Sequence, residues 1–152
     1  MVKLLDKNSY PPVIDHVGWR LWQASEFWKA QLDSIMIGKG HLWFAEARGN
    51  IVRHIGPKAL PQTVLAARMG LTKQAVQQLL DELVADGIVE RKAAPGDKRS
   101  NLVVFTAKGL KAMHDANQAK RLIETRCRKL LGAEKFKAFM DALDAMTVAL
   151  SK

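Results

Sequence analysis

The 152-residue sequence contains a single cysteine and no long apolar run. One cysteine, Cys127, excludes a framework of intrachain disulfides and favours a reducing, cytoplasmic location. No apolar segment approaches the roughly 20 residues that a helix needs to cross a bilayer. The first residues, MVKLLDKNSYPPV, lack the apolar core and the small-residue cleavage site of an export signal. We therefore expect a cytoplasmic protein that does not enter membranes.

Sequence motifs for catalysis and metal binding are absent as well. The histidines are scattered, and the sequence has no His-x-x-x-His pair, no Cys-x-x-Cys pair and no phosphate-binding loop. The glycines that flank Lys39 are better explained as the end of a helix than as a phosphate cradle. No enzyme activity, metal or cofactor is therefore expected.

Acidic residues are scarce relative to basic ones, since 15 Asp+Glu against 24 Lys+Arg give a net charge of +9. A surface this basic attracts polyanions, nucleic acid first and anionic membrane second. A solvated basic face without such a partner is the alternative. The length fits one domain, and an apolar content of 48% fits an ordinary soluble globular protein.

Helical patterns occupy both ends of the chain, where apolar residues recur every three or four positions. We expect a first helix that ends at residues 38–40, a second over residues 41–55, and two last helices over residues 108–131 and 133–150. The apolar stripe of the first helix consists of Ile14, Val17, Leu21, Ala24, Trp28, Leu32 and Ile35.

The stretch LAARMGLTKQAVQQLL, residues 65–80, is an amphipathic helix interrupted at Gly70. Two short helices that cross steeply need a small residue at their closest approach, which Ala66 supplies. The turn between them needs a residue that tolerates positive φ, which Gly70 supplies, and Thr72 can cap the second helix. The pattern predicts a helix-turn-helix over residues 62–81, with apolar contact between its helices through Leu65, Leu71, Val76 and Leu79.

The polar face at the start of the second helix is suited to the major groove of DNA. Lysine can contact phosphate or guanine, and glutamine can pair with both groove-edge atoms of adenine. Taken alone, the stretch fits an αα-hairpin with a polar exposed end equally well. The candidate DNA-binding residues are Thr72, Lys73, Gln74, Gln77 and Gln78.

A hairpin decides between these two interpretations. Short strands are predicted over residues 88–92 and 102–106, around a basic turn at residues 95–100. A recognition helix followed directly by such a ribbon is a winged helix. The sequence DKRSNLVVFTAKG, residues 97–109, strongly resembles the wing of the MarR family of bacterial transcriptional regulators. In that family an Asp-x-Arg pair at the wing tip is followed by a strand that ends in Leu-Thr-x-x-Gly.

The resemblance covers nearly the whole chain, because residues 65–73 and 79–91 are also similar to the family's helix-turn-helix and first wing strand. It implies a mainly α fold: a winged helix-turn-helix with a short β-hairpin wing and N- and C-terminal dimerisation helices. The expected single domain, residues 1–152, divides into N-terminal helices with a ligand site (14–56), the winged helix (57–107) and C-terminal dimerisation helices (108–152).

The resemblance also implies roles for the wing residues Asp97, Lys98, Arg99 and Ser100. Arg99 would reach into the minor groove of double-stranded DNA while Asp97 holds its guanidinium group in place. Family members often carry Ser-Arg where this sequence has Gln77-Gln78, and Phe105 replaces the usual leucine. The missing arginine favours an operator that is richer in A·T contacts.

The terminal helices carry more apolar surface than one winged helix can cover. The resemblance implies a homodimer joined by these helices, which presents two recognition helices to a pseudo-palindromic operator. Trp19 and Trp22 lie off the apolar stripe of the first helix, which favours contact with a partner subunit. Some of these side chains could instead bind a small aromatic or carboxylate effector, and the candidates are His16, Arg20, Trp22, Trp43 and Arg48.

The expected function is sequence-specific transcriptional regulation, by a repressor that a small-molecule effector releases from DNA. Repression is favoured over activation because occupying a promoter needs only binding. The alternatives are a non-specific architectural DNA-binding protein, a protein-interaction module, and a redox-sensing regulator that uses Cys127. The glutamines argue against the first and the Asp97-x-Arg99 pair against the second. Cys127 has arginine neighbours that could make it oxidisable, but we interpret it as structural.

Overall fold

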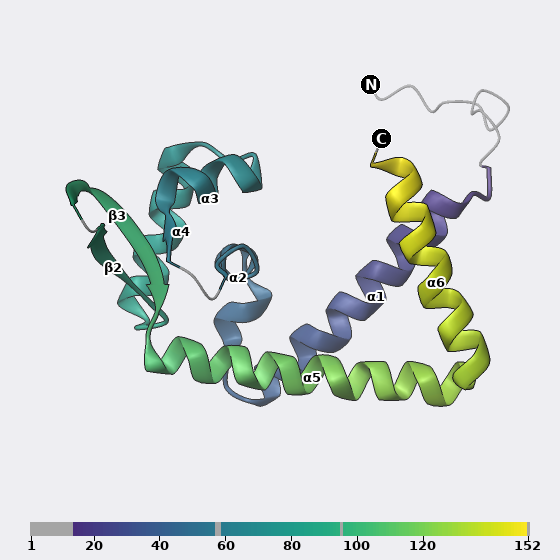
Figure 1. Cartoon of the computed structure of the whole chain (residues 1–152). Coiled ribbons are helices and arrows are strands. Elements are labelled where there is room, and N and C mark those ends of the chain that lie inside the picture. The colour runs from purple at the N-terminus through teal and green to yellow at the C-terminus, as the bar shows by residue number, and fades with distance from the viewer. Residues whose placement is uncertain (1–13, 57–58, 95, 152) are drawn as a thin grey trace, which may run out of the picture.

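The computed structural model describes residues 14–56, 59–94 and 96–151, and for residues 94 and 97–101 it describes the backbone only. The chain is mainly helical with one three-stranded antiparallel sheet, which confirms the predicted fold class (Figure 1). The elements in chain order are α1 (Val17–Gly38), the 3-10 helix η2 (Leu42–Ala45), α2 (Ala47–Val52), β1 (Leu60–Pro61), α3 (Gln62–Met69), α4 (Lys73–Ala85), β2 (Val89–Ala94), β3 (Asp97–Phe105), α5 (Ala107–Leu131) and α6 (Ala133–Leu150).

Helices α3 and α4 form the predicted helix-turn-helix. Gly70 adopts the left-handed conformation with φ 62° and ψ 25°, and the Oγ1 atom of Thr72 accepts a hydrogen bond of 3.1 Å from the Ala75 amide. Ala66 is buried where the two helices meet. Leu71, also expected in this contact, lies in the turn with 41% of its surface exposed, whereas Leu65 and Val76 are fully buried.

The sheet has the strand order β1-β3-β2, and its two long strands form the wing. Both are longer than predicted, since residues 97–100, which were expected in a turn, belong to β3. Strand β1 was not predicted. It contains two residues and exists only through pairing with β3, where Leu60 lies opposite Val103.

The single helix predicted over residues 41–55 is wrong, because Glu46 is extended, with φ −87° and ψ 172°, and separates η2 from α2. The break lets α2 pack directly against the backbone of η2. A Cβ atom on Gly49 would lie 2.1 Å from the carbonyl oxygen of Phe44, so glycine is required at this contact. Trp43 and Phe44 of η2 are buried as a result.

The hydrophobic core lies between the winged helix, the C-terminal part of α1, η2, α2 and α5. Helix α5 contributes small side chains, including Ala112, Ala116 and Ala119, which allow its backbone to approach the neighbouring elements closely. Each large aliphatic side chain buried here contributes on the order of 1.5–3 kcal/mol. Those that are fully buried are Leu32, Met36, Ile51, Val52, Leu65, Val76, Leu80, Leu83, Ile88, Val89 and Val103.

We define two arms of the chain: residues 14–31 of the α1 region, and all of α6. Both arms are largely exposed to solvent. Figure 1 shows α5 running from the wing to α6, with α1 extending away from the winged helix. No residue of the first arm is buried, and in α6 only Phe136 is. Trp28, expected in the core, is 40% exposed. None of the helices in the described part of the chain is long and apolar enough to cross a membrane.

Candidate nucleic-acid interface

The outward face of α4 collects the polar residues that the sequence singled out. Burial of Val76, Leu80 and Leu83 fixes the opposite face of this helix against the core. The five predicted residues, Thr72, Lys73, Gln74, Gln77 and Gln78, are all exposed. The structure therefore brings them together on one surface over the first two turns of α4.

One of these glutamines is held by neighbours that sequence reasoning missed. The Nε2 atom of Gln62 in α3 donates to Oε1 of Gln77 at 2.6 Å, and Nε2 of Gln77 donates to Oδ1 of Asp81 at 2.9 Å. Asp81 in turn forms an ion pair with Arg91 of β2, with 2.7 Å between Oδ1 and Nη2. The hydrogen bonds from Arg91 and then Gln77 lower the pKa of Asp81. The spacing of Gln77 and Asp81 on one helix could have revealed this pair, whereas Gln62 and Arg91 come from other elements.

The wing and α6 lie on opposite sides of the molecule (Figure 1). Backbone pairing of β2 and β3 extends to Ala94 opposite Asp97, with an irregularity between Ala93 and Ala94. The side chains of Asp97, Lys98, Arg99 and Ser100 lie outside the described residues, so their predicted contacts with DNA stay predictions.

A pocket of about 550 Å³ lies between α1, the α2 segment and α5, next to the end of β3. This size is typical of sites for small organic ligands. Arg53, Asn117 and Lys120 bring polar groups to it, and the Arg53 guanidinium carbon lies 5.6 Å from the centroid of the Phe44 ring. The other lining residues are glycine or apolar: Trp28, Leu32, Phe44, Val52, Ile55, Gly56, Phe105, Leu110, Met113 and Ala116.

Comparison with known proteins finds a similar family over part of the chain. A sequence model of the MarR family matches residues 49–100, which span α2, the helix-turn-helix and most of the wing. Over this segment the chain is similar to the MarR family. It is 30% identical to the HTH-type transcriptional regulator PetP of Rhodobacter capsulatus over 87 residues, which make up 57% of this chain and 52% of PetP.

Solved structures of other proteins share the fold. The reduced form of MarR from E. coli superposes with a TM-score of 0.74 at 21% identity, covering 89% of this chain and 98% of MarR. The transcriptional repressor CouR, solved bound to a 23-mer DNA duplex, superposes with a TM-score of 0.68 at 23% identity, covering 90% of this chain and 93% of CouR.

The five predicted effector candidates do not line the pocket described above. At the start of the first arm, His16 caps α1 by accepting a hydrogen bond from the Trp19 amide, and Arg20 pairs with Asp15. Trp22 stacks on Trp19, with ring centroids 4.9 Å apart. These residues stay untested as ligands.

The two remaining effector candidates are engaged inside the chain. Trp43 is buried in the core. Arg48 joins α2 to the C-terminal end of α4, because it pairs with Glu46 at 2.7 Å and with Asp86 at 2.6 Å. The polar pocket residues Arg53, Asn117 and Lys120 were not predicted from the sequence, because the lining of the pocket comes from several elements. A signal was present, since Met113, Asn117 and Lys120 recur at helical spacing along α5.

Cys127 is partly buried against the core, and its arginine neighbours have other partners. Arg126 donates to the side chain of Gln31. Arg128 pairs with Glu124 at 3.2 Å, and its guanidinium carbon lies 4.5 Å from the centroid of the Phe136 ring. These contacts agree with the interpretation of Cys127 as a structural residue, which stays a prediction.

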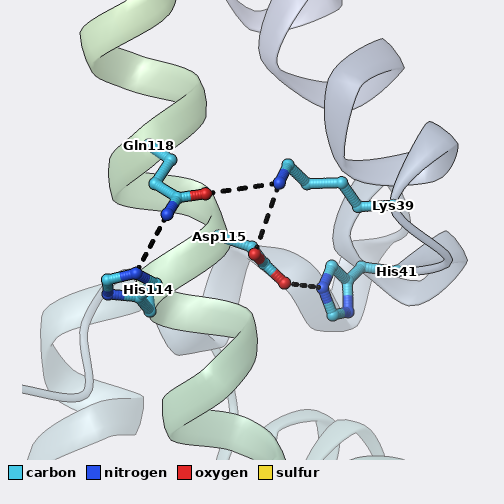
Figure 2. A network of polar contacts seen from close by, with 5 residues as sticks. All are labelled: Lys39, His41, His114, Asp115 and Gln118. Atoms are coloured by element: carbon cyan, nitrogen blue, oxygen red, sulfur yellow. Dashed lines mark hydrogen bonds and ion pairs between the residues drawn. The ribbon is translucent and has the colours of Figure 1, made fainter.

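A polar network joins the end of α1 to α5 (Figure 2). The Asp115 carboxylate contacts Nε2 of His41 at 2.9 Å and Nζ of Lys39 at 3.3 Å. Lys39 also donates to Gln118, whose amide nitrogen lies 3.0 Å from Nε2 of His114. The hydrogen bond from His41, followed by the contribution of Lys39, lowers the pKa of Asp115.

Asp115 is therefore expected to make the fold sensitive to acid. Its unfolded-state pKa is about 3.9, so the charged form stabilises the folded chain above that pH, and this stabilisation is lost as the pH falls through the lowered pKa. Below about pH 4, the free energy of unfolding should fall more steeply for the wild type than for Asp115→Asn. Denaturant titrations at a series of acidic pH values measure both slopes, and parallel slopes would contradict this assignment.

Proposed function

We propose that this protein is a sequence-specific DNA-binding transcriptional regulator. The observation that carries the proposal is the exposed polar face of α4, fixed from behind by a buried apolar face and flanked by a two-stranded wing. A net charge of +9 supports a polyanionic partner. PetP, which is named as a transcriptional regulator, and CouR, which was solved on a DNA duplex, support the same function.

The regulator acts as a homodimer joined by its arms. Large apolar side chains are exposed on both arms, and a single chain leaves them in water. A second copy would cover them and would place two α4 helices on the half-sites of a pseudo-palindrome. The exposed side chains include Val17, Trp19, Trp22, Phe27, Phe139, Met140, Val148 and Leu150.

The pocket supports release from DNA by a small effector. A bound ligand would touch α1, part of which forms the first arm, and α5, which runs from the wing to the second arm, α6. A ligand that fits one relative orientation better shifts the population toward it and changes DNA affinity. The apolar wall with Arg53 and Lys120 suits an aromatic carboxylate. We favour repression over activation, because a protein that occupies a promoter can repress it by binding alone.

Footprinting on the DNA beside its own gene tests the function. A sequence-specific regulator protects a bounded site, whereas an architectural protein protects DNA diffusely and a protein-interaction module protects none. A thermal-shift screen of small aromatic acids tests the effector, since a ligand of the folded state raises the melting temperature. Absence of a bounded footprint would overturn the proposed function.

Substitutions at Arg99 and Gln74 separate positioning on DNA from base recognition. Arg99→Ala is expected to weaken operator binding by ~1–3 kcal/mol and to lower the salt dependence by about one phosphate contact. Gln74→Ala is expected to lose about 1–3 kcal/mol of discrimination at one or two base pairs, with salt dependence unchanged. Asp97→Ala should resemble a weaker Arg99→Ala.

Salt titrations on operator, mismatched operator and random duplex measure these effects for each variant. If Gln74→Ala weakens binding to all three duplexes equally, α4 does not recognise bases. If Arg99→Ala leaves binding unchanged, the wing does not contact DNA.

A further inference from the structure

We propose that Gln62, Asp81 and Arg91 hold the amide of Gln77 in one orientation and thereby determine which base pair α4 recognises. This inference rests on the proposed function, because it concerns how the outward face of α4 reads DNA. The four residues, which we call the Gln77 relay, join the first helix of the helix-turn-helix, the recognition helix and the first wing strand.

The Asp81 carboxylate determines the orientation of the Gln77 amide. An ionised carboxylate can only accept hydrogen bonds. Arg91 keeps Asp81 ionised, so Gln77 must present its NH₂ group to Asp81, and its oxygen must then face Gln62. Gln62 completes the relay by donating to that oxygen at 2.6 Å. Reversing the Gln77 amide would place its oxygen against the Asp81 carboxylate, which has no hydrogen to donate.

The relay leaves part of the Gln77 amide free for DNA. One N–H and one oxygen lone pair remain, which is what pairing with adenine N7 and N6 requires. An amide that can rotate follows adenine on either strand, whereas a fixed amide matches adenine on one strand only. The relay should therefore let the protein distinguish A·T from T·A at a single position of each half-site.

A purely structural role explains the relay poorly. Gln77 and more than half of the Asp81 side chain surface are exposed, whereas the Arg91 side chain is only 22% exposed, so the ion pair can serve the fold but the contacts of Gln77 lie in water. Exposed polar contacts contribute little to folding stability because water competes for both partners. Ordering a glutamine side chain before DNA arrives, in contrast, removes part of the entropy cost of binding. Gln62, Asp81 and Arg91 are therefore positioning residues, and Gln77 is the residue that contacts the base.

The test uses the full-length protein and duplexes recovered by it from a random library. Each of the four base pairs is placed at every position of the recovered half-site, and affinities are measured for the wild type and for Gln77→Ala, Gln62→Met and Asp81→Asn. Gln62→Met keeps the length of the side chain but removes the donor. Asp81→Asn keeps the shape but lets that end donate or accept. Thr63→Val, at an exposed α3 position beside Gln62, is the matched control.

At one position the wild type should prefer A·T over T·A, or the reverse, by roughly 5- to 100-fold. Gln77→Ala, Gln62→Met and Asp81→Asn should each reduce this ratio to within about 3-fold. Thr63→Val should leave the ratio unchanged, and the melting temperatures of all variants should stay close to that of the wild type.

The outcomes distinguish the proposals. If Gln77→Ala lowers the ratio but Gln62→Met and Asp81→Asn do not, Gln77 reads the base without help from the relay, and the inference fails. If Gln77→Ala changes no ratio, the inference fails while sequence-specific binding stands. If the wild type recovers no preferred sequence, the proposed function fails and the relay has nothing to orient.

Discussion

Replacement of Gly109 by alanine is expected to lower the free energy of unfolding by about 3 kcal/mol, the upper end of the usual cost of overpacking. A Cβ atom at Gly109 would lie 2.1 Å from the carbonyl oxygen of Ile88 and 3.1 Å from its carbonyl carbon. Both atoms belong to the backbone, so no side chain can rotate away to make room. The first turn of α5 would have to move away from β2.

The same junction is held by Thr106, which makes such a movement costly. Its Oγ1 atom accepts a hydrogen bond from the Gly109 amide at 3.1 Å and donates to the carbonyl oxygen of Gly87 at 2.5 Å. The Thr106 amide also donates to the Ile88 carbonyl. A displaced helix start would weaken these bonds together and leave the carbonyl groups of Gly87 and Ile88 without these partners.

Gly38→Ala is the matched control for this substitution. Like Gly109, Gly38 lies in a helix, as the last residue of α1. A Cβ atom at Gly38 would meet nothing within 4 Å. Alanine should stabilise that position slightly, by up to about 1 kcal/mol. Chemical denaturation of both variants measures the difference. Equal stability of Gly109→Ala and the wild type would show that α5 does not depend on close approach to Ile88.

Gly109 illustrates the boundary between what sequence and structure reveal. The pattern Thr106-x-x-Gly109 could be recognised in the sequence as a family motif. Its physical reason could not, because it depends on a carbonyl group about 20 residues away along the chain. Local signals were sufficient where the cause is local, as at Gly70 with its positive φ and at Thr72 with its capping hydroxyl.

Errors in the predicted elements have the same origin. The break at Glu46 depends on α2 packing against Phe44, and β1 depends on pairing with a strand about 40 residues later. For the candidate site, the polar face of α4 could be predicted from helical periodicity alone. Gln62 and Arg91 could not be predicted as partners of that face, because no periodicity within α4 places residues of α3 and β2.

The wing strands were underestimated for a related reason. Turn-forming residue types in the sequence 95–100 predicted a loop, yet pairing between β2 and β3 continues to Asp97. Local turn propensity is weak compared with the gain from extending an existing ladder of hydrogen bonds. The length of a hairpin is therefore less predictable than its existence.

Disrupting the arms is expected to have the largest effect of all on DNA binding. The double variant Phe139→Lys/Val148→Lys places two charges on a helix whose described side chains include only one buried residue, Phe136. In the single chain these positions are 47% and 61% exposed, so lysine costs little there. In a dimer interface it would bury unpaired charge, which is strongly unfavourable. The variant should therefore fold but remain monomeric.

Loss of the dimer should reduce operator affinity by about 100-fold or more, because the second half-site then no longer binds as part of the same complex. Sedimentation should report a dimer of the 16.9 kDa wild-type chain at micromolar concentration and a monomer of the variant. The added positive charge works against this loss, so weaker binding cannot be attributed to charge. Asp141→Lys changes the net charge by the same amount, at a position that is 62% exposed and already charged, and it removes no apolar side chain, so it is the charge control and should stay dimeric. Truncation after Gly132 should go further and leave an aggregating or unfolded chain. A wild-type protein that sediments as a 16.9 kDa monomer would remove the basis for both expectations.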